Sequence, residues 1–572
     1  MALLLKLVYA FGLYVTVASV YSLCRLIQNY RIARRVGVPI RFAPIDHNNR
    51  LWLVVDRKVA WLLRRWLPFG LGDNNLTRFD WRGWEFEDKY KEHLLLGDAF
   101  MHVSPDKNWL YVCNPDSVLD ILRRGRDFPR PMEIYELLNF FGPNLATVEG
   151  QQWKTQRRMA MSYFNEANNE MVWHETVSLA SDALHSWASK PFVTSTADDT
   201  RTITLHVLSK AAHGKSNKFS SRDDQEDVNP ETNYKEALRI VLDNTMLIAA
   251  LGRKFLAKNW LPSALKKVNT ACEAFQRHLT EAYEDEKQAL ICGRSSSKST
   301  YMASLIHASQ DEATGSTGGL TEDEIYGNMY IFSFAGHDST THTLTFALML
   351  MAVNPDVQDW ISAEVQHVFG DQDPSNWNYG TGFPRLHRCM ATMLETARLF
   401  TPVPIVKSTG KRATSLKVGD KIIAVPADTH VILNYAALHT LPRIWGEDSL
   451  AWRPARWIQG SPNGEFDMEQ VVWPQRGAFI AWSEGQRSCP GRKFSQVEFV
   501  GTMAALFKDW RVEPLTMAGE SIEAARRRLM HQISTDSAQI LLLQMLHPEK
   551  APLVWKKRDA GVSNDLSMVP KV

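Results

Sequence analysis

The hydrophobic and polar positions of the chain change their period along its length. Phe100–Cys113 alternates as β-strands do, and Asn114 and the two residues after it give a turn and the start of a helix. Helical periods dominate from there to about residue 400, after which short strand-like runs return, such as Lys421–Val425 and Val431–Leu433. This pattern predicts an α+β fold that is mostly α-helical, with small β-sheets towards each end.

Polar stretches and chain ends set the expected domain organisation. Ser216–Thr232, Gly293–Thr300 and Ser309–Gly319 are polar and predict surface loops. No internal repeat interrupts the body, so we expect one large domain over residues 71–550. Residues 551–572 predict a loose C-terminal tail.

The N-terminus predicts a membrane anchor. The stretch from Leu7 to Cys24 carries no charge, and its length approaches that of a membrane-spanning helix. Arg25, Arg31, Arg34 and Arg35 follow this stretch, whereas only Lys6 precedes it. The positive-inside rule then places the body in the cytosol, and residues 1–24 are expected to be a single-pass signal anchor in the endoplasmic reticulum. The alternative is a secretory signal that is cleaved near Ala18 or Ser22.

Residues 25–70 predict a basic, proline-containing linker. Pro39 and Pro44 break the chain before the body, and aromatic residues then alternate with basic ones. The aromatic residues are Trp52, Trp61, Trp66 and Phe69, and the basic ones are Arg57, Lys58, Arg64 and Arg65. This segment fits an amphipathic helix at a membrane surface, or a surface helix packed on the domain.

Composition excludes several classes of function. Lys and Arg total 65 against 63 for Asp and Glu, so no bulk charge indicates nucleic-acid binding. Hydrophobic residues make up 45% of the 572 residues, which is enough for a large core. The six cysteines are scattered without a C-x-x-C pair, which argues against zinc sites and a disulfide framework.

The segment Trp482-Ser-Glu-Gly485-Gln-Arg487-Ser-Cys489-Pro-Gly491 carries the most specific chemistry of the chain. Its glycines allow a tight turn close to a flat ligand, and backbone N–H groups there can stabilise a thiolate. Arg487 can meet a carboxylate of the same ligand. A flat ligand that bears iron and carboxylates and is held by one thiolate is haem.

A second pattern lies in a long predicted helix. Thr321 and Glu324 form a capping box, and the helical period continues to about Val353. Within it, Ala335-Gly336-His337-Asp338-Ser339-Thr340 combines small residues with an acid beside a hydroxyl. Ile331, Ala335 and Ser339 share one face, where the helix would kink or leave a groove beside a ligand. Asp338 and Ser339 are suited to relaying protons.

Two further pairs lie at helical spacing. Glu395 and Arg398 are three residues apart and can form an ion pair. Trp153 and Arg157 lie one turn apart, so both donors can reach one carboxylate.

Taken in order, these motifs resemble the cytochrome P-450 superfamily. W-x-x-x-R, A-G-x-D-S-T, E-x-x-R, P-x-R-W and the cysteine loop occur in the order of that family, over roughly residues 95–545. The resemblance is greatest to membrane-bound microsomal members, and the cysteine loop has a fungal style. Two positions depart from the pattern: Trp482 stands where phenylalanine is usual, and Ser339 stands where threonine is usual.

The resemblance implies a role for each matching residue. Cys489 would ligate the iron of haem b, and Asp338 and Ser339 would deliver protons to dioxygen. Glu395, Arg398 and Arg456 would form a structural triad. Residues expected to hold the cofactor are Trp153, Arg157, Ala335, Lys407, Trp482, Arg487 and Gly491. Residues expected to contact substrate are Ile331, Ala335, Val403 and Ile405, within the segments 127–144, 331–339, 403–406 and about 532–535.

The implied activity is that of a haem-thiolate monooxygenase, which inserts one oxygen atom of O2 into a lipophilic small molecule. The chain has no flavin domain and no dinucleotide fingerprint, so electrons are expected from an NADPH-dependent cytochrome reductase, with cytochrome b5 as a second candidate donor. Arg492 and Lys493 either form a basic docking patch or belong to a solvated helix start. The alternative functions are an electron-independent haem-thiolate isomerase or dehydratase, and a non-catalytic haem-binding protein.

Overall fold

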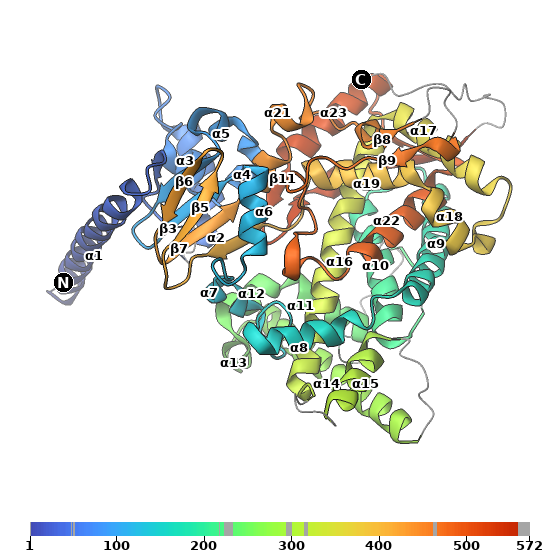
Figure 1. Ribbon diagram of the computed structural model, residues 1–572, viewed down its shortest axis with the longest axis horizontal. Helices are drawn as coiled ribbons and strands as arrows, with labels where there is room; N and C mark the ends of the chain where they lie inside the picture. Colours follow the sequence, from blue (N-terminus) through green and yellow to red (C-terminus); the bar gives the residue numbers. More distant parts are fainter. Residues whose placement is uncertain are drawn as a thin grey trace.

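Helices make up most of the fold, and the strands gather mainly beside one another in one lobe (Figure 1). The computed structural model describes residues 2–46, 49, 52–216, 218–221, 231, 233–292, 300–313, 319–460 and 466–558. The helices are α1 (Ala2–Arg34), α2 (Trp52–Trp66), α3 (Asn75–Phe79), α4 (Trp84–Asp88), α5 (Lys91–Leu96), α6 (Pro115–Arg123), α7 (Met132–Tyr135), α8 (Gly150–Met161), α9 (Glu166–Ala188), α10 (Thr196–His213), α11 (Tyr234–Asp243), α12 (Thr245–Leu251), α13 (Arg253–Leu256), α14 (Ser263–Ile291), α15 (Tyr301–Ala313), α16 (Glu322–Val353), α17 (Pro355–Phe369), α18 (Tyr379–Gly382), α19 (His387–Leu399), α20 (Tyr435–Leu438), α21 (Pro442–Trp445), α22 (Arg492–Phe507) and α23 (Ile522–Thr535). The mostly helical α+β prediction is confirmed.

The main sheet joins strands that are far apart in the sequence. Its order is β1-β2-β3-β7-β4, with bounds Ile40–Phe42, Ala99–Val103, Asn108–Val112, Thr429–Leu433 and Ile405–Ser408. β2 and β3 form an antiparallel hairpin, and β3 pairs in parallel with β7. The strand predictions near residues 100–113 and 431–433 are therefore confirmed, and β4 is placed at the edge of the sheet.

The remaining strands form two-stranded sheets. They pair β5 (Thr414–Val418) with β6 (Lys421–Val425), β8 (Ile458–Gln459) with β9 (Gln470–Val471), β10 (Trp510–Pro514) with β13 (Leu553–Lys557), and β11 (Ser537–Gln539) with β12 (Leu543–Met545). Because β13 is paired with β10, the predicted tail over residues 551–572 is wrong for its first part.

Helix α16 crosses the middle of the molecule (Figure 1). The side chain of Thr321 accepts the N–H of Glu324 while the Glu324 carboxylate accepts the N–H of Thr321, so the predicted capping box is confirmed. The helix continues without a break to Val353, including the segment where a kink was expected. Most of its residues are buried, because it packs against α10, α19 and α23. Helix α16 is therefore held in place by the helices packed around it.

The N-terminal region differs from a simple anchor and linker. α1 runs to Arg34, β1 pairs with β2, and α2 packs on the body with Trp52 and Ala60 buried. Searched over the described part of the chain, no helix is both long enough and apolar enough to cross a membrane, so the predicted transmembrane anchor is not confirmed.

The predicted surface loops fall mostly outside the described residues. Of the described parts, residues 216, 218–221, 231, 300 and 319 have no helix or strand, in agreement with a loop, whereas residues 309 to 313 continue helix α15. That part of the loop prediction is wrong.

Candidate active site

A cavity of about 370 Å³ lies against α16 and the cysteine loop. Segments from nine stretches of the sequence line it, from the loop around α7 and helix α8 to the cysteine loop and the turn before β12. It brings together almost all the site residues that the sequence predicts: Trp153, Arg157, Ile331, Ala335, Ser339, Val403, Ile405, Lys407, Trp482, Arg487, Cys489 and Gly491.

The cysteine loop is shaped by its backbone. Gly485 has φ +74°, and a Cβ there would lie 2.9 Å from the carbonyl oxygen of Leu122, so this turn needs glycine. The N–H of Cys489 donates to the carbonyl of Trp482 at 2.8 Å, which closes the loop. The indole N–H of Trp482 donates to the Ser495 hydroxyl at 3.0 Å and fixes the ring at the cavity wall.

The Cys489 thiol is exposed to the cavity but surrounded by protein. Burial raises its pKa, whereas the N–H of Gly491 and the charges of Arg157 and Arg492 act in the opposite direction. A thiol that ligates a metal ion loses its proton outright. These groups are therefore placed to stabilise a thiolate once iron is bound.

Four cations gather on one side of the cavity: Arg130, Arg157, Lys407 and Arg487. Burial and the neighbouring Arg130 lower the pKa of Arg487 to about 10 and that of Lys407 to about 8.

The contacts of Arg487 show that its positive charge is only partly neutralised by neighbouring carboxylates. It bonds Glu149 at 3.1 Å and stacks on the Trp153 ring at 4.4 Å. Its buried Nη1 has no hydrogen-bond partner within the described ranges. A buried cation that is only partly paired is costly, and carboxylates on a bound ligand would relieve that cost. The donor set fits the two propionates of haem.

Asp338 and Ser339 take different positions. Ser339 lines the cavity, and its hydroxyl donates to the carbonyl of Ala335 at 2.7 Å. Asp338 does not line the cavity, and its carboxylate lies 3.0 Å from Nδ1 of His337. Burial opposes ionisation of Asp338, but the charges of His337, His342 and Arg201 outweigh it and lower its pKa. The predicted relay pair is adjacent in sequence, yet only its hydroxyl faces the cavity.

The predicted triad of Glu395, Arg398 and Arg456 is formed away from the cavity. Arg398 donates Nε and Nη2 to the Glu395 carboxylate at 2.8 and 2.9 Å, and Arg456 donates Nε to it at 2.8 Å. The charges of these arginines outweigh the effect of burial and hold the pKa of Glu395 below its usual value. The triad ties α19 to the segment before the cysteine loop, as a structural role requires.

Some lining residues were not predicted. Tyr301, Thr340 and Leu542 face the cavity without having been expected there, whereas Arg130, Tyr135 and Phe332 lie within the expected segments 127–144 and 331–339. No local motif marks Leu542, because the fold alone brings its segment to the site. Thr340 was quoted in the helix motif but was not among the predicted site residues. The expected substrate contacts at 532–535 lie on α23 and do not line the cavity, whereas Leu542 in the following turn does.

Comparison with known proteins decides the family. The family model described as cytochrome P-450 matches residues 83–536. The chain belongs to the cytochrome P-450 family. It resembles the cytochrome P-450 monooxygenase 124 of Postia placenta, with 30% identity over 78% of this chain and 83% of that protein. It also resembles a cytochrome P-450 monooxygenase of Arthrobotrys oligospora, with 26% identity over 92% of this chain and 95% of the relative.

A solved structure supports the fold of this P-450. The crystal structure of the cytochrome P-450DA haem domain matches with a TM-score of 0.64 at 17% identity, over 91% of this chain and 98% of that one. The chain is therefore a monooxygenase with the haem-thiolate fold, and its cofactor is haem b. Cys489, the four cations and Trp153 are the residues that would hold it.

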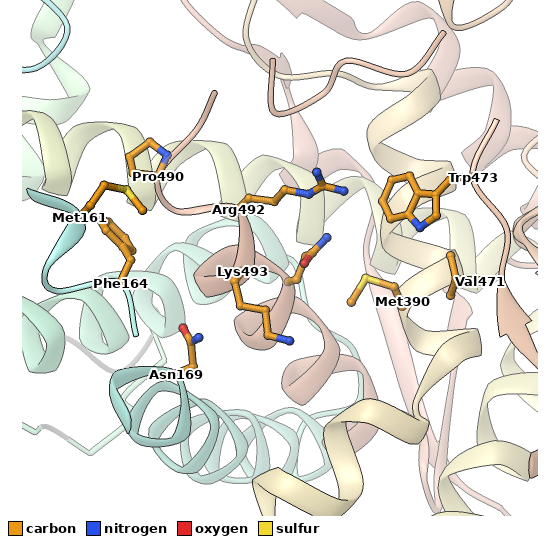
Figure 2. A pocket seen from close by; sticks show the side chains of 10 residues that line it. Met161, Phe164, Asn169, Met390, Val471, Trp473, Pro490, Arg492 and Lys493 are labelled. Carbon is orange, nitrogen blue, oxygen red and sulfur yellow. The ribbon is translucent and has the colours of Figure 1, made fainter. Parts of the chain in front are cut away.

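A second hollow shares Phe164 and Pro490 with the first cavity, and Figure 2 shows the side chains that line it. Its walls include Arg492 and Lys493 of α22, and Trp473, whose surface is 48% exposed. The guanidinium of Arg492 lies over the Trp473 ring, 4.8 Å from its centroid. Within the described residues, no carboxylate forms an ion pair with Arg492 or Lys493. This face is therefore basic and partly apolar.

Proposed function

We propose that this monooxygenase oxidises a lipophilic small molecule with electrons from an NADPH-dependent cytochrome reductase. The observation that carries the substrate class is the large apolar share of the cavity lining. The apolar lining is built from Leu138, Leu145, Leu208, Ile331, Phe334, Val403, Ile405 and Leu542. Apolar lining with few polar groups favours burial of an apolar ligand.

Different residues of the chain bind the cofactor, leave space for the substrate and supply a hydroxyl to the cavity. The cysteine loop binds and orients the cofactor, which when bound supplies the iron chemistry of dioxygen activation. Arg130, Arg157, Lys407 and Arg487 would bind its carboxylates. Small Ala335 leaves space on the α16 face, and Ser339 offers a hydroxyl to that space. Asp338 would act on the cavity through Ser339 and water, since its carboxylate does not line the cavity.

The basic hollow of Figure 2 supports docking of an acidic electron donor. It shares Pro490, the residue after Cys489, with the first cavity, so a donor bound there would be close to Cys489. Charge complementarity mainly raises the rate of association. We expect Arg492→Glu and Lys493→Glu to slow reduction by the reductase more at low salt than at high salt. Lys421→Glu, on a distant hairpin, is the matched control, and equal effects of all three changes would contradict this docking site. The same comparison with cytochrome b5 tests that second candidate donor.

Membrane association at the endoplasmic reticulum is part of the proposal. It rests on the outer face of α2, where Trp61 and Trp66 are exposed beside Lys58 and Arg65. Exposed tryptophans with basic neighbours suit a membrane interface. Sedimentation with anionic vesicles tests it: the double change Trp61→Ser and Trp66→Ser should reduce the bound fraction, and unchanged binding would contradict a role for α2.

The deciding experiment reconstitutes the full chain with haem, reductase and NADPH. Lipophilic candidates are screened for spectral shifts, and positive ones for oxygenated product. Oxygen and NADPH consumption coupled to product supports the proposal. Conversion without NADPH would instead indicate an isomerase or dehydratase, and haem binding without any conversion would indicate a non-catalytic haem protein.

A further inference from the structure

His439 is a fully buried histidine at the end of α20, and it lies between two segments of the cavity wall. On one side, its Nε2 accepts the backbone N–H of Ile480 at 3.0 Å. Ile480 directly precedes residues 481–483, which line the cavity where the cysteine loop begins. On the other side, Nδ1 of the histidine lies 2.9 Å from the hydroxyl oxygen of Thr401. Thr401 directly precedes residues 402–405, which also line the cavity.

The hydrogen bonds assign one tautomer to this ring. A backbone N–H only donates, so Nε2 of His439 carries a lone pair and no proton. The hydroxyl of Thr401 donates its one proton to the carbonyl of Ala397 at 2.6 Å, so towards His439 it only accepts. Nδ1 therefore carries the ring proton, and the ring is neutral. Burial and the charges of Arg398 and Lys89 lower the pKa of His439 to about 3, which agrees with this state.

The histidine is itself held in place. Nη1 of Arg398, a member of the structural triad, donates to the backbone carbonyl of His439 at 2.6 Å. The imidazole ring lies 5.1 Å from the ring of Phe479, which lies 6.0 Å from the ring of Trp482. A side chain that is fixed on all sides in this way sets the position of the groups bonded to it.

We propose that His439 is a positioning residue, which holds the cysteine loop at a fixed distance from the wall segment 402–405. Its Nε2 fixes the start of the loop that carries Cys489, and its Nδ1–H fixes the start of the wall segment. The place of a substrate on that wall relative to the sulfur then decides which substrate atom is oxidised, because a shift of about 1 Å already misplaces reacting groups. The role towards substrate rests on the proposed function, whereas the hold on the loop does not.

Two substitutions separate the two bonds. In His439→Gln, the amide oxygen reaches the position of Nε2 and accepts the N–H of Ile480, but the bond to Thr401 is lost. In His439→Asn, the amide N–H group stands near the position of Nδ1 and donates to Thr401, but the bond to Ile480 is lost. The same two changes at His93 of α5 are the controls, because His93 is also buried, burial lowers its pKa to about 4, and its Nδ1 lies 2.8 Å from the carbonyl oxygen of Gly97.

The loop is measured without turnover. Hydrogen exchange reports the backbone N–H of Ile480, and electron paramagnetic resonance of the resting holoenzyme reports the environment of the thiolate. We expect His439→Asn to speed exchange of that N–H about fivefold, as loss of one hydrogen bond predicts, and to shift the g values. His439→Gln should stay near the wild type in both measurements.

The wall is measured with 4-phenylimidazole, a probe that combines an iron-binding imidazole with an apolar ring. His439→Gln and Thr401→Val both remove the bond between the histidine and the wall. Each should therefore weaken binding of the probe, followed by its absorbance shift, about fivefold and change the ratio of products from an oxidised substrate. Thr401→Ser keeps the hydroxyl and should restore the wild-type affinity and product ratio.

The inference is overturned if His439→Asn exchanges the N–H of Ile480 at the wild-type rate, or if His439→Gln alters the loop as much as His439→Asn does. It is also overturned if Thr401→Val binds the probe as the wild type does, or if the changes at His93 have the same effects. Should both variants of His439 lose haem and fail to fold, Thr401→Val and Thr401→Ser still decide, since they leave the histidine in place. The proposed function fails separately, when the wild type forms no oxygenated product.

Discussion

Replacement of Glu395 by glutamine tests the physical account of the buried triad. The wild-type carboxylate is completely buried and accepts bonds from Arg398, Arg456, the backbone N–H of Arg453 and the indole of Trp457. Glutamine keeps the shape but removes the charge, and its amide presents donors to groups that also donate. The buried guanidinium of Arg398 then lacks its carboxylate partner, and Arg456 keeps only Asp448, whose Oδ2 lies 3.1 Å from its Nη2.

The expected cost follows from these contacts. Removing one member of a buried ion pair costs about 3–5 kcal/mol, because the remaining charge stays buried and unpaired. An unfolding entropy of about 2.1 cal/mol/K per residue gives roughly 1.2 kcal/mol per degree for 572 residues. We therefore expect the thermal unfolding midpoint to fall by about 3–4 °C.

The assay is thermal unfolding of the holoprotein by circular dichroism and calorimetry. The matched control is Glu322→Gln, because Glu322 is exposed and lies 3.8 Å from Lys287. An exposed pair contributes about 0–1 kcal/mol, which is less than about 1 °C here. If Glu395→Gln lowers the midpoint no more than Glu322→Gln does, the triad does not stabilise the fold in the way described.

The difference between wild type and Glu395→Gln should also depend on pH. The folded-state pKa of Glu395 lies below the ordinary value of 4.5, because the charges and hydrogen bonds of its partners outweigh the effect of burial. A lowered folded-state pKa contributes stability that is fully present above about pH 4.5 and is lost as pH falls through the folded value. The midpoints of the two proteins should therefore converge below pH 4.5, and a constant difference would refute the linkage.

Three further substitutions have expected outcomes. Cys489→Ser should abolish the thiolate-type spectrum of the reduced carbonyl complex, and retention of that spectrum would disprove the axial assignment. Gly142→Ala should lower the unfolding midpoint by about 2 °C or more, since φ of Gly142 is +129° and a Cβ there would lie 1.9 Å from the carbonyl oxygen of Asp323. The control is Gly125→Ala, which should have a midpoint near that of the wild type because its Cβ would meet nothing within 4 Å. Trp482→Phe should keep haem and the thiolate spectrum and cost only about 1 kcal/mol for the lost indole hydrogen bond, so loss of haem would show that Trp482 does more than cover the site.

Local signals made much of this site predictable. The capping box of Thr321, the turn at Gly485 and the helical spacing of Glu395 and Arg398 all depend on residues close in sequence. Such interactions follow from backbone geometry alone, and each was found where the pattern put it. Arg456 was predicted only through the family motif, since nothing local links it with residues more than 50 positions earlier.

Contacts between distant segments escaped prediction for the same reason. β13 joins the body because its residues pair with β10, and strand pairing depends on what the fold brings alongside. Leu542 reaches the cavity from a turn that no motif marks.

The sequence by itself determined the family and predicted the cysteine and many other residues that line the cavity, because these rest on residue types at fixed spacing. Only the tertiary structure decided which acid faces which way. Asp338 and Ser339 are neighbours in the chain, but a helix points successive side chains about 100° apart, so one reaches the cavity and the other does not. Glu498 of α22 shows the converse, since no pattern in the sequence marks it, yet its complete burial raises its pKa well above the usual value.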